Sequence, residues 1–446
     1  MNKPSIIFLT GNAGTGKTTF LKHIMGKSDA PIDEDNIYFI EAVNSVEDGN
    51  KIVVAPTGVA AINAGGVTIN SFFQINPYKK YSPKMGYREV FAEFKYKTEK
   101  KAIIKEMDVL IIDEISMVKC EMLDLLDNIL KTFRGNYSLP FGGVQLVVIG
   151  DLFQLPPIKS KPQDLNLEYK TEYFFSAKIF HECLFSDKVK FIELKKIYRQ
   201  KNDEFISILN NVRDGSILDS QLKSLNDRTK LPESDTEFIT ITTHNANANE
   251  INKIKYDAID SEEFNFKATM SGEFKDDFFK QIELVSLKVG AQVMVIKNNN
   301  SRGYYNGMIG NITEINENNV VINVKGKSVK VFIEKWEKFE AQLSKSIGGE
   351  SKIQMVPTAS FEQMPLKLAW AITVHKSQGL TFDNVIADVD ASFDSGQVYV
   401  ALSRCTSLEG LYLKNSIPMG AIKVDRDVVS FTKYIKAMND KLKVVA

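Results

Sequence analysis

The stretch TGNAGTGKTT, Thr10–Thr19, directly follows the apolar run SIIFL, Ser5–Leu9. It matches the pattern G-x-x-x-x-G-K-[ST], whose fixed positions are here Gly11, Gly16, Lys17 and Thr18. Glycines let the backbone N–H groups of such a loop wrap a phosphate chain, and the helix that follows points its positive end at the phosphates. The stretch therefore predicts a nucleotide-phosphate loop between a buried strand and a helix.

Each side chain of this loop has an expected role. Lys17 is predicted to reach the β- and γ-phosphates, and the Thr18 hydroxyl to bind Mg²⁺. A fortuitous glycine turn is the alternative, and the strand that precedes the loop argues against it. The residues expected to contact ATP are Gly11, Ala13, Gly14, Thr15, Gly16, Lys17, Thr18 and Thr19.

Two acidic residues, Asp113 and Glu114, follow the apolar part of the run DVLIIDEIS. The carboxyl end of a buried parallel strand is where open α/β sheets bind ligands. We expect Asp113 to hold Mg²⁺ through water and Glu114 to polarise the attacking water. The alternative is that the pair only begins a helix, where acidic residues are favoured. A second carboxylate favours hydrolysis over phosphoryl transfer to a small molecule.

A third strand end, in VVIGDLFQLPP, carries Gln154. A glutamine in a loop is usually just solvated. Because this one follows another strand of the same predicted sheet, we expect its amide to sense the γ-phosphate.

The composition is that of an ordinary globular protein: 446 residues, 43% hydrophobic and 25% charged. The 56 basic and 56 acidic residues cancel, so a polyanionic partner must be bound by a local basic surface. Three scattered cysteines share no metal-ligand spacing and suit a reducing compartment. With no apolar run of roughly 20 residues and no leader, we expect a soluble cytoplasmic protein, bacterial or phage-like and nucleoid-associated, without a targeting peptide.

Short β-branched runs that alternate with helical stretches indicate an α/β protein with two parallel-sheet lobes. The first series of expected strands is Ser5–Leu9, Lys51–Ala55, Asp108–Ile112 and Val144–Ile149, and the second is Lys190–Leu194, Glu237–Thr242, Asn384–Val389 and Leu411–Leu413. Closely spaced alternating strands with Asn/Gly turns indicate a small β-barrel inserted in the second lobe. The predicted organisation is a first lobe over 1–65 and 102–188, a wedge-like insertion over 66–101 rich in basic and aromatic residues, a second lobe over 189–251 and 357–446, and the barrel over 252–356.

Seven blocks, in order, resemble the helicase motifs of the PIF (petite integration frequency) and RecD-like branch of superfamily-one helicases. They are APTGVAA (55–61), TINSFF (68–73), DEIS (113–116), FGGVQLVVIGDLFQLPPI (141–158), KKIYRQ (195–200), AWAITVHKSQGLTFD (369–383) and GQVYVALSRC (396–405). Met122–Arg134 resembles the family's signature segment. Two departures stand out: Asn70 replaces the usual His, and four residues precede the first strand where a glutamine-bearing helix is usual.

The resemblance implies two RecA-like parallel-sheet lobes with an SH3-like barrel insertion, ATP and Mg²⁺ in the cleft between the lobes, and single-stranded DNA across both. It implies an ATP-dependent DNA helicase that moves 5′-to-3′ and unwinds duplex or structured DNA, including G-quadruplexes and RNA–DNA hybrids. Genome maintenance, including repair, recombination and telomere maintenance, is the implied role. The expected partners are single-stranded DNA and single-strand/double-strand junctions, with a monomer in solution and no membrane.

Arg199 and Arg404 occupy matching motif positions in the predicted second lobe. An arginine supplied across an interface stabilises the transition state at the γ-phosphate. A surface salt bridge is the alternative for any single arginine. The catalytic set expected from the residues and the resemblance is therefore Lys17, Glu114, Gln154, Arg199 and Arg404.

Nucleic-acid contacts are expected in both lobes. Hydroxyls and backbone N–H groups after a strand suit phosphate contact, and an exposed aromatic ring can stack on a base. One of the two neighbouring phenylalanines of TINSFF is expected to be buried. His375 has no further His or Cys at ligand spacing, so a phosphate or sugar contact is preferred to metal binding. The expected contacts are Pro56, Thr57, Asn70, Phe72, Phe73, His244, Thr373, His375, Lys376 and Ser377.

Three other functions are alternatives for a chain with a phosphate loop. A P-loop transferase for a small molecule would not explain two lobes with paired arginines. A catalytically silent DNA clamp would be expected to lack Lys17 or Glu114, and both are present. An RNA-selective helicase stays open, because contact through phosphate and stacking is nearly indifferent to the 2′-hydroxyl.

Overall fold

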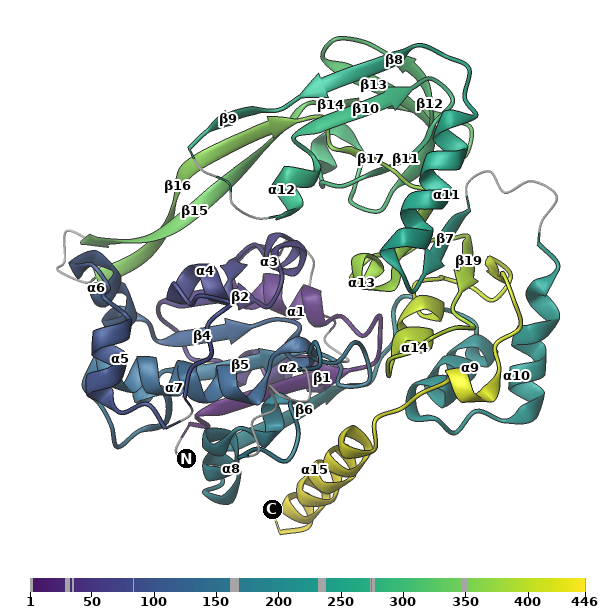
Figure 1. Ribbon diagram of the computed structural model, residues 1–446. Coiled ribbons are helices and arrows are strands. Elements are labelled where there is room, and N and C mark those ends of the chain that lie inside the picture. The colour runs from purple at the N-terminus through teal and green to yellow at the C-terminus, as the bar shows by residue number, and fades with distance from the viewer. Residues whose placement is uncertain are drawn as a thin grey trace. The chain divides into compact units, whose positions relative to one another are not determined.

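The computed structural model describes residues 3–28, 33, 36–82, 84–160, 168–231, 238–272, 274, 277–345 and 351–445 (Figure 1). The chain divides into two compact units, each built around its own parallel sheet. The first unit comprises Met1–Tyr198, Phe339–Val356 and Asp425–Ala446, and the second Arg199–Lys338 and Pro357–Val424. Within the described residues, no helix combines the length and the apolar character that a bilayer crossing requires.

The first unit has a six-stranded parallel sheet in the order β3-β2-β4-β5-β1-β6. Its strands are β1 (Ile6–Gly11), β2 (Lys51–Ala55), β3 (Val67–Thr68), β4 (Val109–Ile112), β5 (Gln145–Ile149) and β6 (Val189–Leu194). Every residue of β1, β4 and β5 is buried, as expected for a parallel sheet covered on both faces. This strand order places the carboxyl ends of β4, β5 and β1 side by side.

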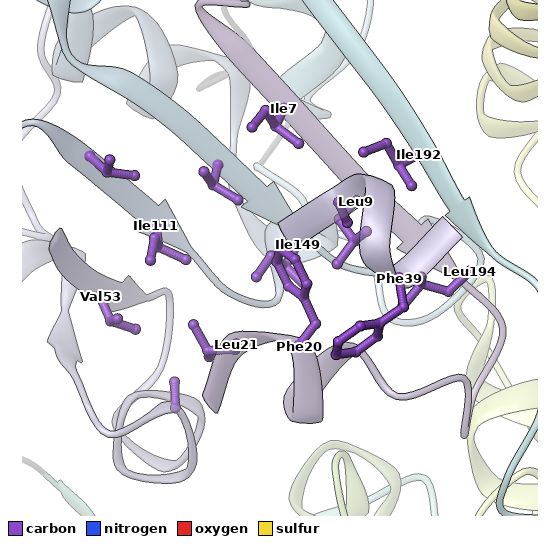
Figure 2. Packing of buried hydrophobic residues seen from close by; sticks show 14 residues of the cluster. Ile7, Leu9, Phe20, Leu21, Phe39, Val53, Ile111, Ile149, Ile192 and Leu194 are labelled. Carbon is purple, nitrogen blue, oxygen red and sulfur yellow. The ribbon is translucent and has the colours of Figure 1, made fainter. Parts of the chain in front are cut away.

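Side chains of β1 fix the helix that follows the phosphate loop. One face of the strand packs against α1 (Lys17–Ile24) and α2 (Ile37–Ser45) in a buried cluster. Its members include Ile7, Leu9, Phe20, Leu21 and Phe39 (Figure 2). Each buried phenylalanine of this kind contributes about 1.5–3 kcal/mol of burial free energy, so the start of α1 is held firmly to the sheet.

The predicted wedge-like insertion is a helical segment of the first unit. Its helices are α4 (Ile69–Phe73), α5 (Tyr87–Glu93) and α6 (Thr98–Glu106). The helix α4 contacts β2 and β3, whereas α5 and α6 lie beside α7 (Cys120–Arg134). The rings of Phe91 and Tyr96 contact Phe133 of α7 at centroid distances of 4.8 and 4.7 Å. Aromatic packing therefore joins the insertion to the helix that the sequence marks as the signature segment. The other helices of this unit are α3 (Gly58–Ala64), α8 (Lys178–Phe185) and α15 (Arg426–Val445).

The tip of a long hairpin also belongs to the first unit. The hairpin consists of β15 (Glu334–Lys345) and β16 (Ser351–Gln363). The Asn50 amide accepts a hydrogen bond from the Ile353 N–H at 2.8 Å and donates to the Ser351 carbonyl at 3.3 Å. One side-chain amide thus holds the hairpin tip next to the amino end of β2.

The second unit has a four-stranded parallel sheet in the order β18-β7-β19-β20. Its strands are β7 (Ile239–Thr242), β18 (Ala371–Thr373), β19 (Val385–Asp388) and β20 (Leu411–Leu413), and its helices are α9 (Asp203–Asp214), α10 (Asp219–Asn226), α11 (Asn245–Asp257), α12 (Asp277–Gln281), α13 (Val374–Ser377) and α14 (Gln397–Leu402). The antiparallel strands are β8 (Glu263–Lys267), β9 (Thr269–Ser271), β10 (Leu284–Lys288), β11 (Gln292–Val295), β12 (Ile309–Ile315), β13 (Asn319–Val324), β14 (Lys327–Phe332) and β17 (Leu366–Leu368). They form the sheets β14-β13-β12-β11-β17 and β10-β8, while β9 pairs with β16 of the hairpin.

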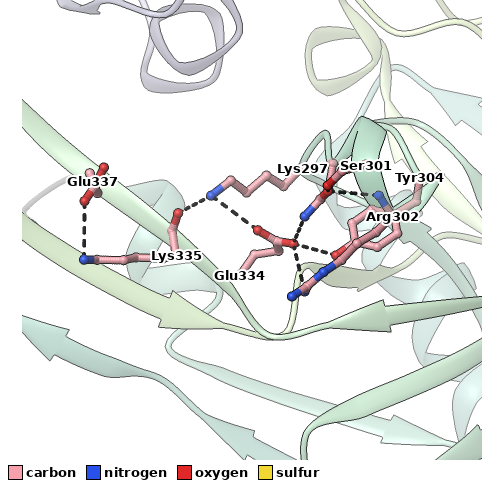
Figure 3. A network of polar contacts seen from close by, with 8 residues as sticks. Lys297, Ser301, Arg302, Tyr304, Glu334, Lys335 and Glu337 are labelled. Atoms are coloured by element: carbon pink, nitrogen blue, oxygen red, sulfur yellow. Dashed lines mark hydrogen bonds and ion pairs between the residues drawn. The ribbon is translucent and has the colours of Figure 1, made fainter.

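A carboxylate network fixes the base of the hairpin (Figure 3). Glu334 accepts hydrogen bonds from the Tyr304 hydroxyl and the Asn299 amide, both at 2.6 Å. Arg302 and Lys297 lie 3.6 and 3.9 Å from its carboxylate oxygens. Two cations and two neutral donors around one carboxylate fix the first residue of β15, just after the end of β14.

The predicted strands are present, with two corrections to their grouping. The run Lys190–Leu194 was expected in the second lobe, but it forms β6, which pairs in parallel with β1 in the first sheet. It is the edge strand of that sheet, and β1 pairs with it over six residues, which satisfies its backbone groups on one side. The expected start of the barrel at residue 252 is also wrong, because α11 runs through it.

Candidate active site and nucleic-acid surface

The phosphate loop has a backbone that only glycine supports. Gly14 and Gly16 adopt φ values of 80° and 91°, the left-handed region that disfavours side chains. A Cβ atom on Gly11 would lie 2.6 Å from the Leu194 carbonyl oxygen. The Thr15 hydroxyl donates to the Asn12 carbonyl at 2.9 Å and closes the loop on itself. The loop is therefore shaped before any phosphate binds.

Lys17 lies across the mouth of this loop. Its ammonium group donates to the carbonyls of Gly11 and Asn12 at 2.7 and 2.9 Å. The neighbouring Thr18 and Thr19 are exposed at the start of α1. A cation and hydroxyl groups at a helix amino end form the environment that a phosphate chain requires.

Asp113 and Glu114 lie where β4 ends. The Glu114 N–H donates to Asp113 Oδ1 at 3.0 Å. Glu114 itself adopts φ 53° and ψ 47°, a left-handed conformation that costs a non-glycine residue about 1–3 kcal/mol and that is concentrated at functional sites. Burial, followed by the Glu114 carboxylate, raises the pKa of Asp113, and nearby Lys17 opposes the rise. The pair thus shares one electrostatic environment with the loop lysine.

Mg²⁺ fits this set of donors. The ion prefers oxygen ligands and is usually held by one or two protein groups together with substrate phosphates and waters. Thr18 and Asp113 would supply the hydroxyl and the carboxylate. Among the described residues no group of three or more His, Cys, Asp and Glu side chains forms a metal cage, so the phosphates would have to complete the coordination.

Gln154 follows β5, the strand between β4 and β1. Its side chain is buried, and its N–H donates to the carbonyl of Asp151 at 3.0 Å. Asp151, fully buried, accepts from the Phe153 N–H at 3.2 Å and holds this turn in place. The structure therefore brings the loop lysine, the acid pair and the glutamine to one edge of one sheet.

Tyr198 contacts the phosphate loop, although it is not among the residues expected to contact ATP. Its N–H donates to the Gly14 carbonyl at 2.8 Å, and its ring lies 3.8 Å from where a Gly16 Cβ would be. The hydroxyl donates to Asp33 at 2.7 Å and accepts from Asn36 at 3.1 Å. The ring is a half-exposed flat surface against the phosphate loop. In the sequence, the only indication of this contact is the position of Tyr198 directly before Arg199 in the motif KKIYRQ.

The two predicted arginines meet within the second unit. Arg199 donates to the Ser403 carbonyl at 3.0 Å, and Arg404 donates to the Val400 carbonyl and the Ser403 hydroxyl, both at 2.9 Å. Burial, and then the charge of Arg404, lower the pKa of Arg199 to about 9, so the Arg199 guanidinium stays charged at neutral pH. Gln200 also donates to the carbonyls of Ser403 and Cys405. The turn after α14 therefore concentrates positive charge.

The predicted nucleic-acid residues of the first unit fall into two groups. Thr57 caps α3, its hydroxyl accepting from the Ala60 N–H at 3.2 Å, and Pro56 precedes it at the end of β2. Within the described residues, the buried amide oxygen of Asn70 has no hydrogen-bond partner. The expectation that one of Phe72 and Phe73 is free to stack on a base is wrong, because both rings are buried. They pack edge to face at 4.8 Å in the short helix α4.

The predicted residues of the second unit differ in exposure. His244, after β7, and His375, in α13, are exposed, and Lys376 donates to Gln281 at 3.4 Å. Thr373 is buried and caps α13. Ser377 is also buried, and its hydroxyl donates inward to the Val374 carbonyl at 2.8 Å, so this side chain is turned away from the solvent. The two imidazole rings are therefore exposed at the end of this sheet, and Lys376 beside them is partly exposed.

The first unit is a P-loop nucleotide-binding unit, and the second is an α/β unit with a buried arginine pair, a combination that defines a P-loop motor ATPase. The sequence model of the PIF1-like helicase family matches residues 1–223, and that of the UvrD-like helicase C-terminal domain matches residues 368–411. The chain belongs to the PIF1-like helicase family, which confirms the resemblance noted in the motifs.

Known relatives agree with this assignment. The ATP-dependent DNA helicase Pif1 of Campylobacter jejuni is 31% identical over 96% of this chain and 94% of its own length. The PIF1 helicase of Danio rerio is 33% identical over 96% of this chain, which spans 61% of that protein. A crystal structure of Bacteroides sp. Pif1 in complex with ADP-AlF4 has a TM-score of 0.81 and 36% identity, covering 98% of this chain and 94% of that one. Bacteroides Pif1 bound to ssDNA has a TM-score of 0.63 and 36% identity, covering 97% and 94%.

Proposed function

We propose that the protein is an ATP-dependent DNA helicase that moves 5′-to-3′ along single-stranded DNA and unwinds duplex or structured DNA. The observation that carries the proposal is the division of the catalytic groups. Lys17, Glu114 and Gln154 lie on the sheet of one unit, while the arginine pair lies on the other. An ATPase whose parts are divided between two units can convert hydrolysis into relative movement of those units.

The hydrolysis step follows from the chemistry of these side chains. Lys17 and the N–H groups of the loop neutralise the phosphate chain, and Mg²⁺, when bound, withdraws charge from the phosphate oxygens. Glu114 accepts a hydrogen bond from the attacking water and orients it, and Gln154 contacts the γ-phosphate or that water. Arg199 and Arg404 stabilise the charge that develops on the transferred group. The Tyr198 ring is the surface against which we place the nucleotide base.

The strand contacts are proposed on both units. On the first unit we propose contacts through Pro56, Thr57 and Asn70, where the Asn70 amide oxygen is buried without a hydrogen-bond partner. His244, His375 and Lys376 serve the second. The Bacteroides relative bound to ssDNA supports a single-stranded substrate, and another structure describes unwinding at forked dsDNA by two coordinating Pif1 helicases. Junctions are therefore the proposed substrate, and a monomer in free solution is the proposed state.

We also propose an SH3-like barrel, structured nucleic-acid substrates, a role in genome maintenance and a cytoplasmic location. The five-stranded antiparallel sheet of the second unit is the candidate for the SH3-like barrel. G-quadruplexes, RNA–DNA hybrids and a role in genome maintenance rest on the resemblance, as does a cytoplasmic location.

ATP hydrolysis by the full chain with single-stranded DNA, single-stranded RNA or no nucleic acid tests the class of substrate. We expect strong stimulation by DNA, and unwinding of duplexes with a 5′ tail but little unwinding of those with a 3′ tail. Lys17→Ala should abolish both activities. Stimulation by RNA alone would favour the RNA-selective alternative, and a preference for 3′ tails would overturn the direction.

A further inference from the structure

An exposed aromatic ring stands at the carboxyl edge of the second unit's sheet. Phe393 lies in the loop between β19 and α14, and it is 51% exposed. Its ring lies beside the ring of His244, with centroids 5.1 Å apart and planes inclined by 46°. His244 follows β7, so two neighbouring strands supply the two rings.

The loop that carries Phe393 is firmly built. The N–H groups of Phe393 and Asp394 both donate to the side-chain oxygen of Gln397, at 3.1 and 3.3 Å, and Gln397 is fully buried. Lys423 donates to the Phe393 carbonyl at 3.2 Å, and the Ser392 hydroxyl to the Val389 carbonyl at 2.7 Å. The exposure of the ring is therefore not a consequence of a loose loop. A ring fixed in advance loses little conformational freedom when a ligand binds.

The surroundings of the two rings point to a nucleic acid. The strand order β18-β7-β19 brings together the residues that follow these strands: His375, His244 and Phe393. Asp394 lies close enough to His375 to act on it electrostatically, which links the Phe393 loop to α13. The carboxyl edge of an open parallel sheet is where ligands bind, and here it presents rings and the ammonium group of Lys376 together.

We propose that Phe393 and His244 form a stacking platform for one nucleobase of the single-stranded DNA that crosses the second unit. This inference rests on the proposed DNA-helicase function and adds a base contact to it. Every base has a π-face, so stacking holds a strand without reading its sequence, as a translocating enzyme requires. The buried Phe72 and Phe73 cannot serve this purpose, which leaves the ring at Phe393 as the exposed candidate beside the predicted contacts.

Fluorescence anisotropy with two labelled probes tests the platform: an oligothymidine, and a strand of equal length with abasic sites in place of the bases. Phe393→Ala should weaken binding of oligothymidine by roughly 5- to 100-fold, the range for loss of one stacked base. Binding of the abasic strand should stay unchanged, because its phosphates are intact. Phe393→Trp should restore binding of oligothymidine.

The control is Phe185→Ala, which removes a 78% exposed ring from α8 of the first unit and should affect neither probe. Wild-type binding of oligothymidine by Phe393→Ala would overturn the inference. So would an equal loss for both probes, since that result would mean that the ring only supports the loop. If the wild-type protein binds neither probe, the proposed DNA function itself fails, which separates the two hypotheses.

Discussion

The carboxyl edges of the two parallel sheets are built in opposite ways. At the edge of the first sheet the backbone forms the candidate phosphate site. Glycines in left-handed conformations shape the loop, and Lys17 donates hydrogen bonds to its carbonyl groups. At the edge of the second sheet the proposed strand contacts are side chains: the rings of His244, His375 and Phe393 and the ammonium group of Lys376. A site formed by the backbone accepts few residue types at each position, because most side chains disfavour the required conformation. A binding surface formed by side chains accepts many. Nucleotide chemistry therefore marks the sequence more strongly than strand binding does.

The arginine pair is the part of the second unit that we expect to act in ATP hydrolysis, as the residues of the first unit do. Arg404→Ala is expected to lower DNA-stimulated ATP turnover by roughly 10³–10⁵-fold, because it removes charge from the transition state. Arg199→Ala should act alike, and DNA binding without nucleotide should change little. Single-turnover hydrolysis measures the effect, with circular dichroism to check the fold. Arg302→Ala, which removes an ion pair with Glu334 and a cation–π contact with Phe332, is the matched control. Near-normal turnover in both arginine variants would make them structural.

The acid pair gives the next largest effect. Glu114→Gln keeps the shape of the side chain but removes the charge that orients the water, so turnover should fall about 10²–10⁴-fold. Binding of a fluorescent ATP analogue should stay intact. Glu121→Gln, at the start of α7, is the control and should keep full turnover. An active Glu114→Gln enzyme would remove this residue as the water-orienting group.

A comparison of two glycines distinguishes the effect of a substitution on ATP binding from its effect on backbone strain. Gly16 and Gly26 both have left-handed φ values, 91° and 64°, but only Gly16 belongs to the phosphate loop. Alanine at either position should cost roughly 1 kcal/mol or more of folding free energy. Only Gly16→Ala should also lose ATP binding, by about tenfold or more, since 1.4 kcal/mol corresponds to a factor of ten. Denaturant unfolding measures the loss of folding free energy, and nucleotide titration measures the loss of ATP affinity. Equal ATP affinity in both variants would contradict a phosphate site formed by the backbone.

A surface cation should have a smaller effect that depends on salt. On single-stranded nucleic acid, a variant that can no longer bind one phosphate should show a slope of log affinity against log salt that is shallower by about 0.7. We expect that change for Lys376→Ala and none for Lys325→Ala, whose ammonium pairs with Asp383 at 2.6 Å. Titrations of oligothymidine over a range of salt concentrations give both slopes. Identical slopes would exclude Lys376 as a phosphate-binding residue.

The smallest expected effect concerns Lys100, which contacts the buried ring of Phe72. The ammonium of Lys100 lies 3.1 Å from the centre of the Phe72 ring. Burial lowers its pKa to about 7, and Glu340 opposes the shift. A lysine whose folded pKa is depressed destabilises the fold as pH falls from about 10.5 to about 7, because the unfolded chain binds the proton first. Lys100→Met should therefore gain thermal stability over the wild type across that window, by about 2–4 °C for each kcal/mol recovered. A constant difference across the window would contradict this.

The accuracy of the sequence-based predictions follows the same division. Gly11, Gly16 and Lys17 were predictable because their spacing dictates a backbone shape. The acid pair was predictable because it ends an apolar run. The assignment of Lys190–Leu194 failed, because the choice of partner strand depends on contacts that are distant in sequence.

Exposure was the other quantity that the sequence did not determine. Phe72 and Phe73 were expected to differ in exposure and do not, and Ser377 turned inward to its own helix. Phe393 was missed because an aromatic residue between Ser392 and Asp394 carries no pattern. Its role depends on a neighbouring ring from a strand far along the chain.

One peptide bond joins two anchors. Tyr198 is tied through its N–H to the phosphate loop, and Arg199, the next residue, is tied through its side chain to the turn that holds Arg404. A flexible linker would absorb displacement as chain entropy, and each extra residue would add up to about 3.3–3.6 Å of reach. With no spare residue between the two anchors, the chain has no slack at this point, and a displacement of one anchor is taken up by the backbone torsions of Tyr198 and Arg199 alone.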